Sequence, residues 1–122
     1  MTSPKFLENE KYINLETYRR DGTPVKTPVW FVVDDEKLYV ITRESTGKVK
    51  RLANNPKVCV VACTFNGKIH GRWVSGTAKR IDGKEAKDAE NLRKKKYGFK
   101  ALLAGFMTKA KGNLVVYSIE LE

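Results

Sequence analysis

Short runs of β-branched and aromatic residues, separated by tight turns, constrain this chain more than any other feature. Residues 25–33 and 38–42 are two such runs, and they flank an acidic turn at residues 34–37. Asp21-Gly22 and Asn66-Gly67 separate further runs, and these dipeptides favour the tight turns of antiparallel hairpins. The sequence therefore predicts an antiparallel sheet built from hairpins.

The same patterns divide the rest of the chain. We expect strands at 12–19, 24–33, 38–42, 57–65, 68–81 and 114–121, helices at 48–54, 85–96 and 99–107, and a helical turn within 5–10. Antiparallel strands of this length and spacing close best into a small barrel. The expected fold is therefore a single domain over residues 1–122, mainly β, with six antiparallel strands.

Pro28 lies inside the second expected strand. Because proline has no N–H to donate, it is tolerated in a sheet only at an edge or a bulge. We therefore expect the strand to bend there, or its backbone to meet a ligand rather than another strand.

The composition fits one globular domain: 122 residues, of which 41% are hydrophobic and 31% charged, which argues against disorder. Cys59 and Cys63 would lie about 13 Å apart along one strand, too far for a disulfide. We expect buried free thiols and a cytoplasmic location. With a single histidine no Cys/His metal site is predicted, and no apolar run reaches the length of a membrane span.

The formal net charge of +10 suggests an anionic partner. Much of the excess falls in residues 79–111, including the run 93–96. A solvated helix face on a basic protein would explain this charge equally simply. A nucleic-acid-binding barrel is less favoured, because the basic residues are not interleaved with aromatic residues along one sheet face.

A polar loop, residues 43–48, follows the strand at 38–42 and precedes an expected helix. It contains the hydroxyls of Ser45 and Thr46 together with Gly47 and Lys48. Backbone N–H groups at a helix start, hydroxyls and a lysine can jointly hold a phosphate. The sequence therefore predicts a phosphate site here. Ser45 and Thr46 could instead only cap the helix, and Lys48 could be a solvated residue of its first turn.

The order of these elements resembles a known family. A D-G turn, the strand P-V-K-T-P-V-W-F, an acidic turn, the strand L-Y-V-I-T, the loop S-T-G-K and a helix ending N-N-P-K-V follow one another. This order is similar to that of the pyridoxamine 5′-phosphate oxidase-like proteins. The resemblance implies an FMN-binding split β-barrel that forms a homodimer, with FMN, or the deazaflavin coenzyme F420, in a groove between the subunits.

The resemblance also implies roles for individual residues. The strand along the isoalloxazine edge would be Val25, Lys26, Thr27, Pro28, Val29 and Trp30. Ile41 and Thr42 would lie at the ribityl chain, and Ser45, Thr46, Gly47 and Lys48 at the phosphate. Position 47 is glycine where the oxidases commonly have arginine, and Trp73 lies near the position of their later-strand glutamine. Lys26 could also be an outward charge, and both tryptophans could be core or dimer-interface residues.

The expected function is that of an FMN- or F420-dependent oxidoreductase, which transfers hydride to or from a small substrate. The cofactor would supply the chemistry, while the protein positions it and controls access. The sequence singles out no catalytic residue. A carrier or sensor that only binds the cofactor is the alternative.

Overall fold

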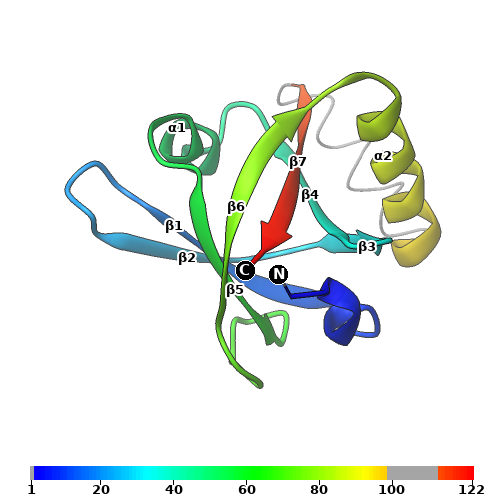
Figure 1. Cartoon of the computed structure of the whole chain (residues 1–122), viewed down its shortest axis with the longest axis horizontal. Coiled ribbons are helices and arrows are strands. Elements are labelled where there is room, and N and C mark those ends of the chain that lie inside the picture. The colour runs from blue at the N-terminus through cyan, green and yellow to red at the C-terminus, as the bar shows by residue number, and fades with distance from the viewer. Residues whose placement is uncertain (1, 99–112) are drawn as a thin grey trace.

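The computed structural model describes residues 2–98 and 113–122, and their centre is one curled antiparallel sheet (Figure 1). The sheet has seven strands in the order β2-β1-β5-β6-β7-β4-β3. The elements are η1 (Pro4–Leu7), β1 (Tyr12–Tyr18), β2 (Pro24–Val29), β3 (Phe31–Asp34), β4 (Lys37–Arg43), α1 (Gly47–Asn54), β5 (Lys57–Cys63), β6 (Val74–Ile81), α2 (Gly83–Tyr97) and β7 (Leu114–Leu121).

The two end strands of the sheet, β2 and β3, are consecutive in the chain and are joined by Trp30. The first half of this segment pairs with β1, and the second half pairs with β4. The sheet therefore closes on itself through a single covalent segment. Leu15, Val40, Val60 and Ile119 are among the side chains that fill its interior, each at most 1% exposed.

The mainly β, antiparallel architecture is confirmed, but the strand count differs from the predicted six. The strand expected at 24–33 is interrupted at Trp30, where the chain changes its pairing partner. The strand expected at 68–81 begins only at Val74. Before it, Ile69 forms an isolated bridge to Cys63, and Gly71 has a φ of +125°. That glycine conformation turns the backbone out of the strand.

The other expected elements are found with small differences. The closing strand has the predicted bounds, and the helix expected at 85–96 is α2, which begins two residues earlier and ends one residue later. The helical turn expected within 5–10 is the short 3₁₀ helix η1. The helix expected at 99–107 and most of the following loop lie outside the described residues.

The two helices cover different parts of the sheet. α2 packs on the outer face of β3, β4 and β7, where Val32, Tyr39, Ile41, Ala89 and Val116 form a second apolar cluster. The Tyr39 hydroxyl donates to Glu85 at 2.6 Å and ties the start of α2 to β4. α1 lies beside β1 and buries Leu52 in the interior. This placement sets the loop before α1 at one end of the barrel (Figure 1).

Candidate functional site

Among residues 2–98 and 113–122, two strand edges lack a neighbouring strand at the break in the 24–34 segment. β2 is an end strand and pairs only with β1. β3 reaches β4 only as far as Val40, so Ile41–Arg43 pair with β7 alone. We call these the open edges: the edge of β2 away from β1, and the β3-side edge of β4 over residues 41–43. Pro28 lies on an end strand, as its missing N–H requires.

Seven of the residues predicted to bind a cofactor lie on these two strands, but their side chains point in different directions. Val25, Thr27 and Val29 are half-buried, whereas Lys26 and Pro28 are exposed. Ile41 points away from the break and is buried under α2, so only its backbone is available at the open edge. The open edges therefore offer mainly backbone N–H and C=O groups, which require partners when they are covered.

Four cations gather where β4 ends and α1 begins. We call Arg19, Arg43, Lys48 and Arg51 the cation cluster. Burial lowers the pKa of Lys48, and the neighbouring charges of Arg51 and Arg43 lower it further. Burial also lowers the pKa of Arg51, with Arg19 adding to the effect. Like charges held together in this way disfavour one another unless an anion joins them.

The cation cluster has no carboxylate partner in residues 2–98 and 113–122. The ion pairs found there are Lys26–Glu16, Lys37–Glu85, His70–Glu10 and Arg80–Glu44. A partly buried cation without a counter-ion costs free energy. The cluster is thus suited to an anion supplied from outside the chain.

The first turn of α1 adds donors to this site. Thr46 is the N-cap residue, but its side chain does not cap the helix. Its hydroxyl instead donates to the carbonyl of Arg43 at 2.9 Å and lies 3.4 Å from the Thr42 hydroxyl. Ser45 is exposed. Free N–H groups and the positive end of the helix therefore face the cation cluster.

Arg51 lies directly over Gly47. A Cβ at position 47 would be 2.8 Å from Nη1 of Arg51, which is closer than such contacts normally allow. Nε of Arg51 donates to the Thr17 hydroxyl at 2.7 Å, which fixes the guanidinium. Arg51 was not among the residues predicted from the sequence to bind a cofactor. The signal was its position four residues after a glycine, because such residues are neighbours on a helix.

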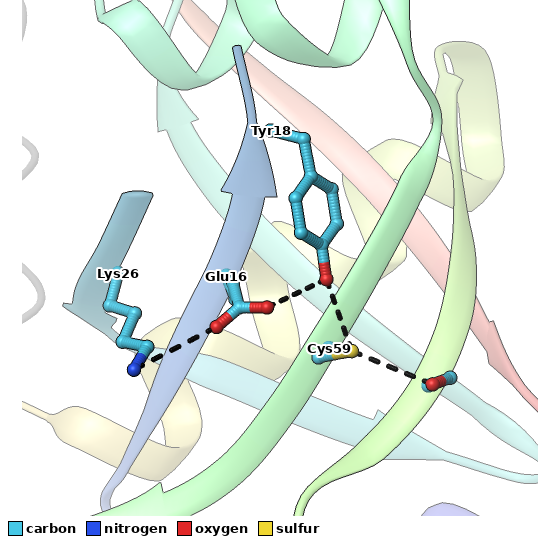
Figure 2. A network of polar contacts seen from close by, with 5 residues as sticks. Glu16, Tyr18, Lys26 and Cys59 are labelled. Carbon is cyan, nitrogen blue, oxygen red and sulfur yellow. Dashed lines mark hydrogen bonds and ion pairs between the residues drawn. The ribbon is translucent and has the colours of Figure 1, made fainter. Parts of the chain in front are cut away.

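Lys26 and Trp73 come together on the outer face of the sheet, apart from the cation cluster. The ammonium of Lys26 lies 5.4 Å from the ring centre of Trp73 and 3.9 Å from Glu16. Figure 2 shows how this contact continues into a polar network: the Tyr18 hydroxyl donates to Glu16 at 2.7 Å and lies 3.3 Å from the thiol of Cys59. The exposed Lys26 pair contributes little stability by itself. The network orients the Lys26 side chain on the outer face of β2.

The two cysteines are free, as predicted, although Cys59 is only half-buried. The lone histidine, His70, is exposed and lies 3.4 Å from Glu10. In the described part of the chain, no cluster of His, Cys, Asp and Glu side chains is of the kind that holds a metal ion. None of the helices described there has the length and apolar character needed to cross a membrane.

Comparisons with known proteins agree with this architecture. The sequence profile of the family described as pyridoxamine 5′-phosphate oxidase matches residues 4–122. No curated protein is similar enough in sequence to match the chain.

Solved structures of the same fold differ in what they are described to do. The heme storage protein HutZ from Vibrio cholerae has a TM-score of 0.74 and 14% identity, and the match covers 97% of this chain and 86% of that one. A conserved hypothetical protein from Mycobacterium tuberculosis has a TM-score of 0.70 and 20% identity, over 100% and 82%. A protein described as an F420 reductase has a TM-score of 0.59 and 19% identity, over 100% and 94%. At these identities the similarity shows the fold alone.

Proposed function

The chain belongs to the pyridoxamine 5′-phosphate oxidase family, and we propose that it binds a phosphorylated flavin-type cofactor, FMN or coenzyme F420, and transfers hydride to or from a small substrate. The observation that carries this proposal is the cation cluster at the start of α1, which has no carboxylate partner among the described residues. A heme storage protein shares the fold, so the cation cluster, and not the fold, supports this cofactor.

The residues present fit a phosphate. Lys48 and Arg51 supply charge, Thr42 and Thr46 supply hydroxyls, and the first turn of α1 supplies backbone N–H groups. Arg51 occupies the space that a side chain at position 47 would fill. We therefore assign to Arg51 the charge that the oxidases commonly place at position 47.

The open edges fit the remainder of such a cofactor. A flavin-type ring carries N–H and C=O groups along one edge, and the unpaired backbone over Val25–Val29 can complement them. Thr42 lies between the break at Trp30 and the proposed phosphate site, where the ribityl chain would pass. Lys26, on the outer face of β2, and the ring of Trp73 next to it would border the flavin-type ring. Once bound, the cofactor supplies the hydride chemistry, while the chain holds, orients and shields it.

The proposal is tested by absorbance and fluorescence titrations of the protein with FMN, coenzyme F420 and hemin. We expect micromolar or tighter binding of FMN or F420. Lys48→Ala and Arg51→Ala should each weaken that binding at least about tenfold, or about 1.4 kcal/mol. Lys50→Ala is the matched control, because Lys50 is an exposed cation on the same helix. It should change the affinity less than about twofold, since exposed charges contribute little.

Two results would contradict the proposal. One is the absence of FMN and F420 binding at micromolar concentration together with tight binding of hemin. The other is an equal loss of affinity in Lys48→Ala and Lys50→Ala. That result would mean that general electrostatic attraction, and not a specific phosphate site, accounts for binding. An oxidoreductase turns over a substrate, whereas a carrier or sensor only binds the cofactor. Assays of turnover with candidate electron acceptors distinguish the two.

We further propose a homodimer with the cofactor in a groove between its subunits, in a cytoplasmic location that suits two free thiols. Sedimentation of the purified chain with and without cofactor tests the assembly. A nucleic-acid partner is not proposed. A steep salt dependence of oligonucleotide binding would speak for one.

A further inference from the structure

The pairing between β1 and β2 stops where its register could have continued. Their register runs from Tyr18 opposite Pro24 to Ile13 opposite Val29. Two residues further, this register would place Lys11 opposite Phe31. Instead, Phe31 begins β3 and pairs with Val40 of β4. Something other than the local sequence must separate Phe31 from Lys11, because both Trp30 and Phe31 favour strands.

The hydroxyl of Tyr97, in the last turn of α2, lies between these two residues. It accepts a hydrogen bond from the N–H of Phe31 at 3.1 Å. It also lies 2.8 Å from the carbonyl oxygen of Lys11 and 3.0 Å from that of Phe31, and its single proton is donated to one of them at a time. A direct ladder bond would join Phe31 N–H to the Lys11 carbonyl. The hydroxyl thus occupies the place of that bond.

Further contacts hold this hydroxyl in position. The ring of Tyr97 stacks on Trp30 with centroids 4.3 Å apart and planes within 7°. The ammonium of Lys96 donates to the Phe31 carbonyl at 3.1 Å and lies 3.6 Å from the centre of the Phe31 ring. The end of α2 therefore contacts both Trp30 and Phe31.

We propose that Tyr97 is a positioning residue of the cofactor site, because its hydroxyl holds the chain from Phe31 onward away from β1 and thereby sets the separation of the open edges. Phe31 and Val40 form the last pair before β4 runs on without a partner on its β3 side, and β2 ends two residues before Phe31. Both open edges therefore start within two residues of the pair that the hydroxyl holds. This inference rests on the proposed function, although the effect of the hydroxyl on the open edges can be tested without a cofactor.

The first part of the test uses the full chain without cofactor. Tyr97→Phe keeps the stacked ring and removes only the hydroxyl. We expect the amide resonances of Phe31, of β2 and of Thr42 to shift in two-dimensional NMR spectra. Tyr39→Phe is the matched control, because it removes another tyrosine hydroxyl that ties α2 to the sheet, through Glu85. It should leave those resonances in place, and its thermal midpoint shows what losing such a tie costs the fold.

The second part measures binding of FMN, coenzyme F420 and inorganic phosphate. Tyr97→Phe should weaken the bound cofactor about fivefold, the equivalent of one neutral hydrogen bond. Phosphate affinity should be unchanged, because the cation cluster is intact. A purely structural loss would instead lower both affinities or neither.

The effect of the hydroxyl on the open edges is overturned if Tyr97→Phe shifts the Phe31 resonance alone and leaves β2 and Thr42 unchanged. The positioning role is overturned if cofactor affinity in Tyr97→Phe equals that in Tyr39→Phe. If the wild-type chain binds neither FMN nor F420, the proposed function fails, while the NMR comparison still decides whether Tyr97 sets the open edges.

Discussion

Two kinds of unpaired strand edge meet at Trp30, and the chain treats them in opposite ways. The β1-side edge of β3 is covered by the end of α2, where Tyr97 and Lys96 bind the backbone N–H and carbonyl of Phe31. The open edges of β2 and β4 have no strand partner among the described residues. The cation cluster lies at the end of the open edges. The stacked rings of Trp30 and Tyr97 lie instead at the covered edge of β3.

This difference distinguishes an edge that the fold uses for its own stability from edges that a ligand could bind. An exposed strand edge tends to pair with other chains, so proteins cover it or interrupt it. The chain covers one edge with its own side chains at the cost of desolvating Lys96. No described residue pairs with the open edges, and like charges gather beside them, which lowers stability without a bound anion. An arrangement of that kind is expected where a ligand completes the fold.

Removing a ring at the covered edge of β3 should lower the free energy of unfolding more than removing one beside β2. Trp30→Ala removes the ring that stacks on Tyr97, and we expect a loss of about 2 kcal/mol in the free energy of unfolding. Trp73→Ala removes an equal volume on the outer face, where the ring meets Lys26, and should cost less than about 1 kcal/mol. Urea unfolding of both variants measures this. Equal losses of unfolding free energy in the two variants would contradict the distinction between the covered edge of β3 and the open edges.

Substitution at the cation cluster beside the open edges should weaken cofactor binding without a stability cost. Gly47→Ala places a Cβ against Arg51 and displaces its guanidinium, so cofactor affinity should fall about fivefold, or about 1 kcal/mol. The same change improves helix propensity by up to about 1 kcal/mol, so the thermal midpoint should not fall. The test is a double-mutant cycle: in an Arg51→Ala background, Gly47→Ala should have no further effect on affinity. A full effect in that background would exclude Arg51 as the cause.

The smallest expected effect is a pH dependence at the covered edge. Burial lowers the pKa of Lys96 to about 8, with Glu10 opposing the shift weakly. The unfolded chain keeps a lysine pKa near 10.5, so between about pH 8 and 10.5 it binds more protons than the folded chain. The free energy of unfolding should therefore rise with pH across that window. Because Lys96 is partly solvated, we expect a gain of only about 0.5 kcal/mol.

Lys96→Met provides the comparison for this prediction. Removing the titrating group should flatten the rise in urea-unfolding free energy between pH 8 and 10. A variant that keeps the full rise would assign the pH dependence to another group.

The sequence predicted those parts of the fold that local patterns determine. The closing strand Leu114–Leu121 and the turn at 34–37 follow from β-branched runs and turn residues, and both were found. The break at Trp30 could not be predicted, because Val29, Trp30 and Phe31 all favour a continuous strand. The Tyr97 hydroxyl that binds the backbone at this break comes from a helix far along the chain.

The candidate site shows the same limit. The loop at residues 43–48 could be located from its composition, because hydroxyls and a lysine before a helix are a local signal. Arg51 was missed, since its contact with Gly47 depends on which helix face meets the barrel. Ile41 and Thr42 point in opposite directions because strand residues alternate, but which of them is buried depends on where α2 packs.

The most direct test of the central claim maps bound cofactor onto the two kinds of edge. Amide NMR spectra of the wild-type chain are recorded during titration with FMN or coenzyme F420. We predict shifts concentrated over Val25–Val29 and Thr42–Lys48, with β3 beyond Phe31 unchanged. Shifts concentrated instead around His70, or spread evenly over the basic surface of α2, would contradict the account.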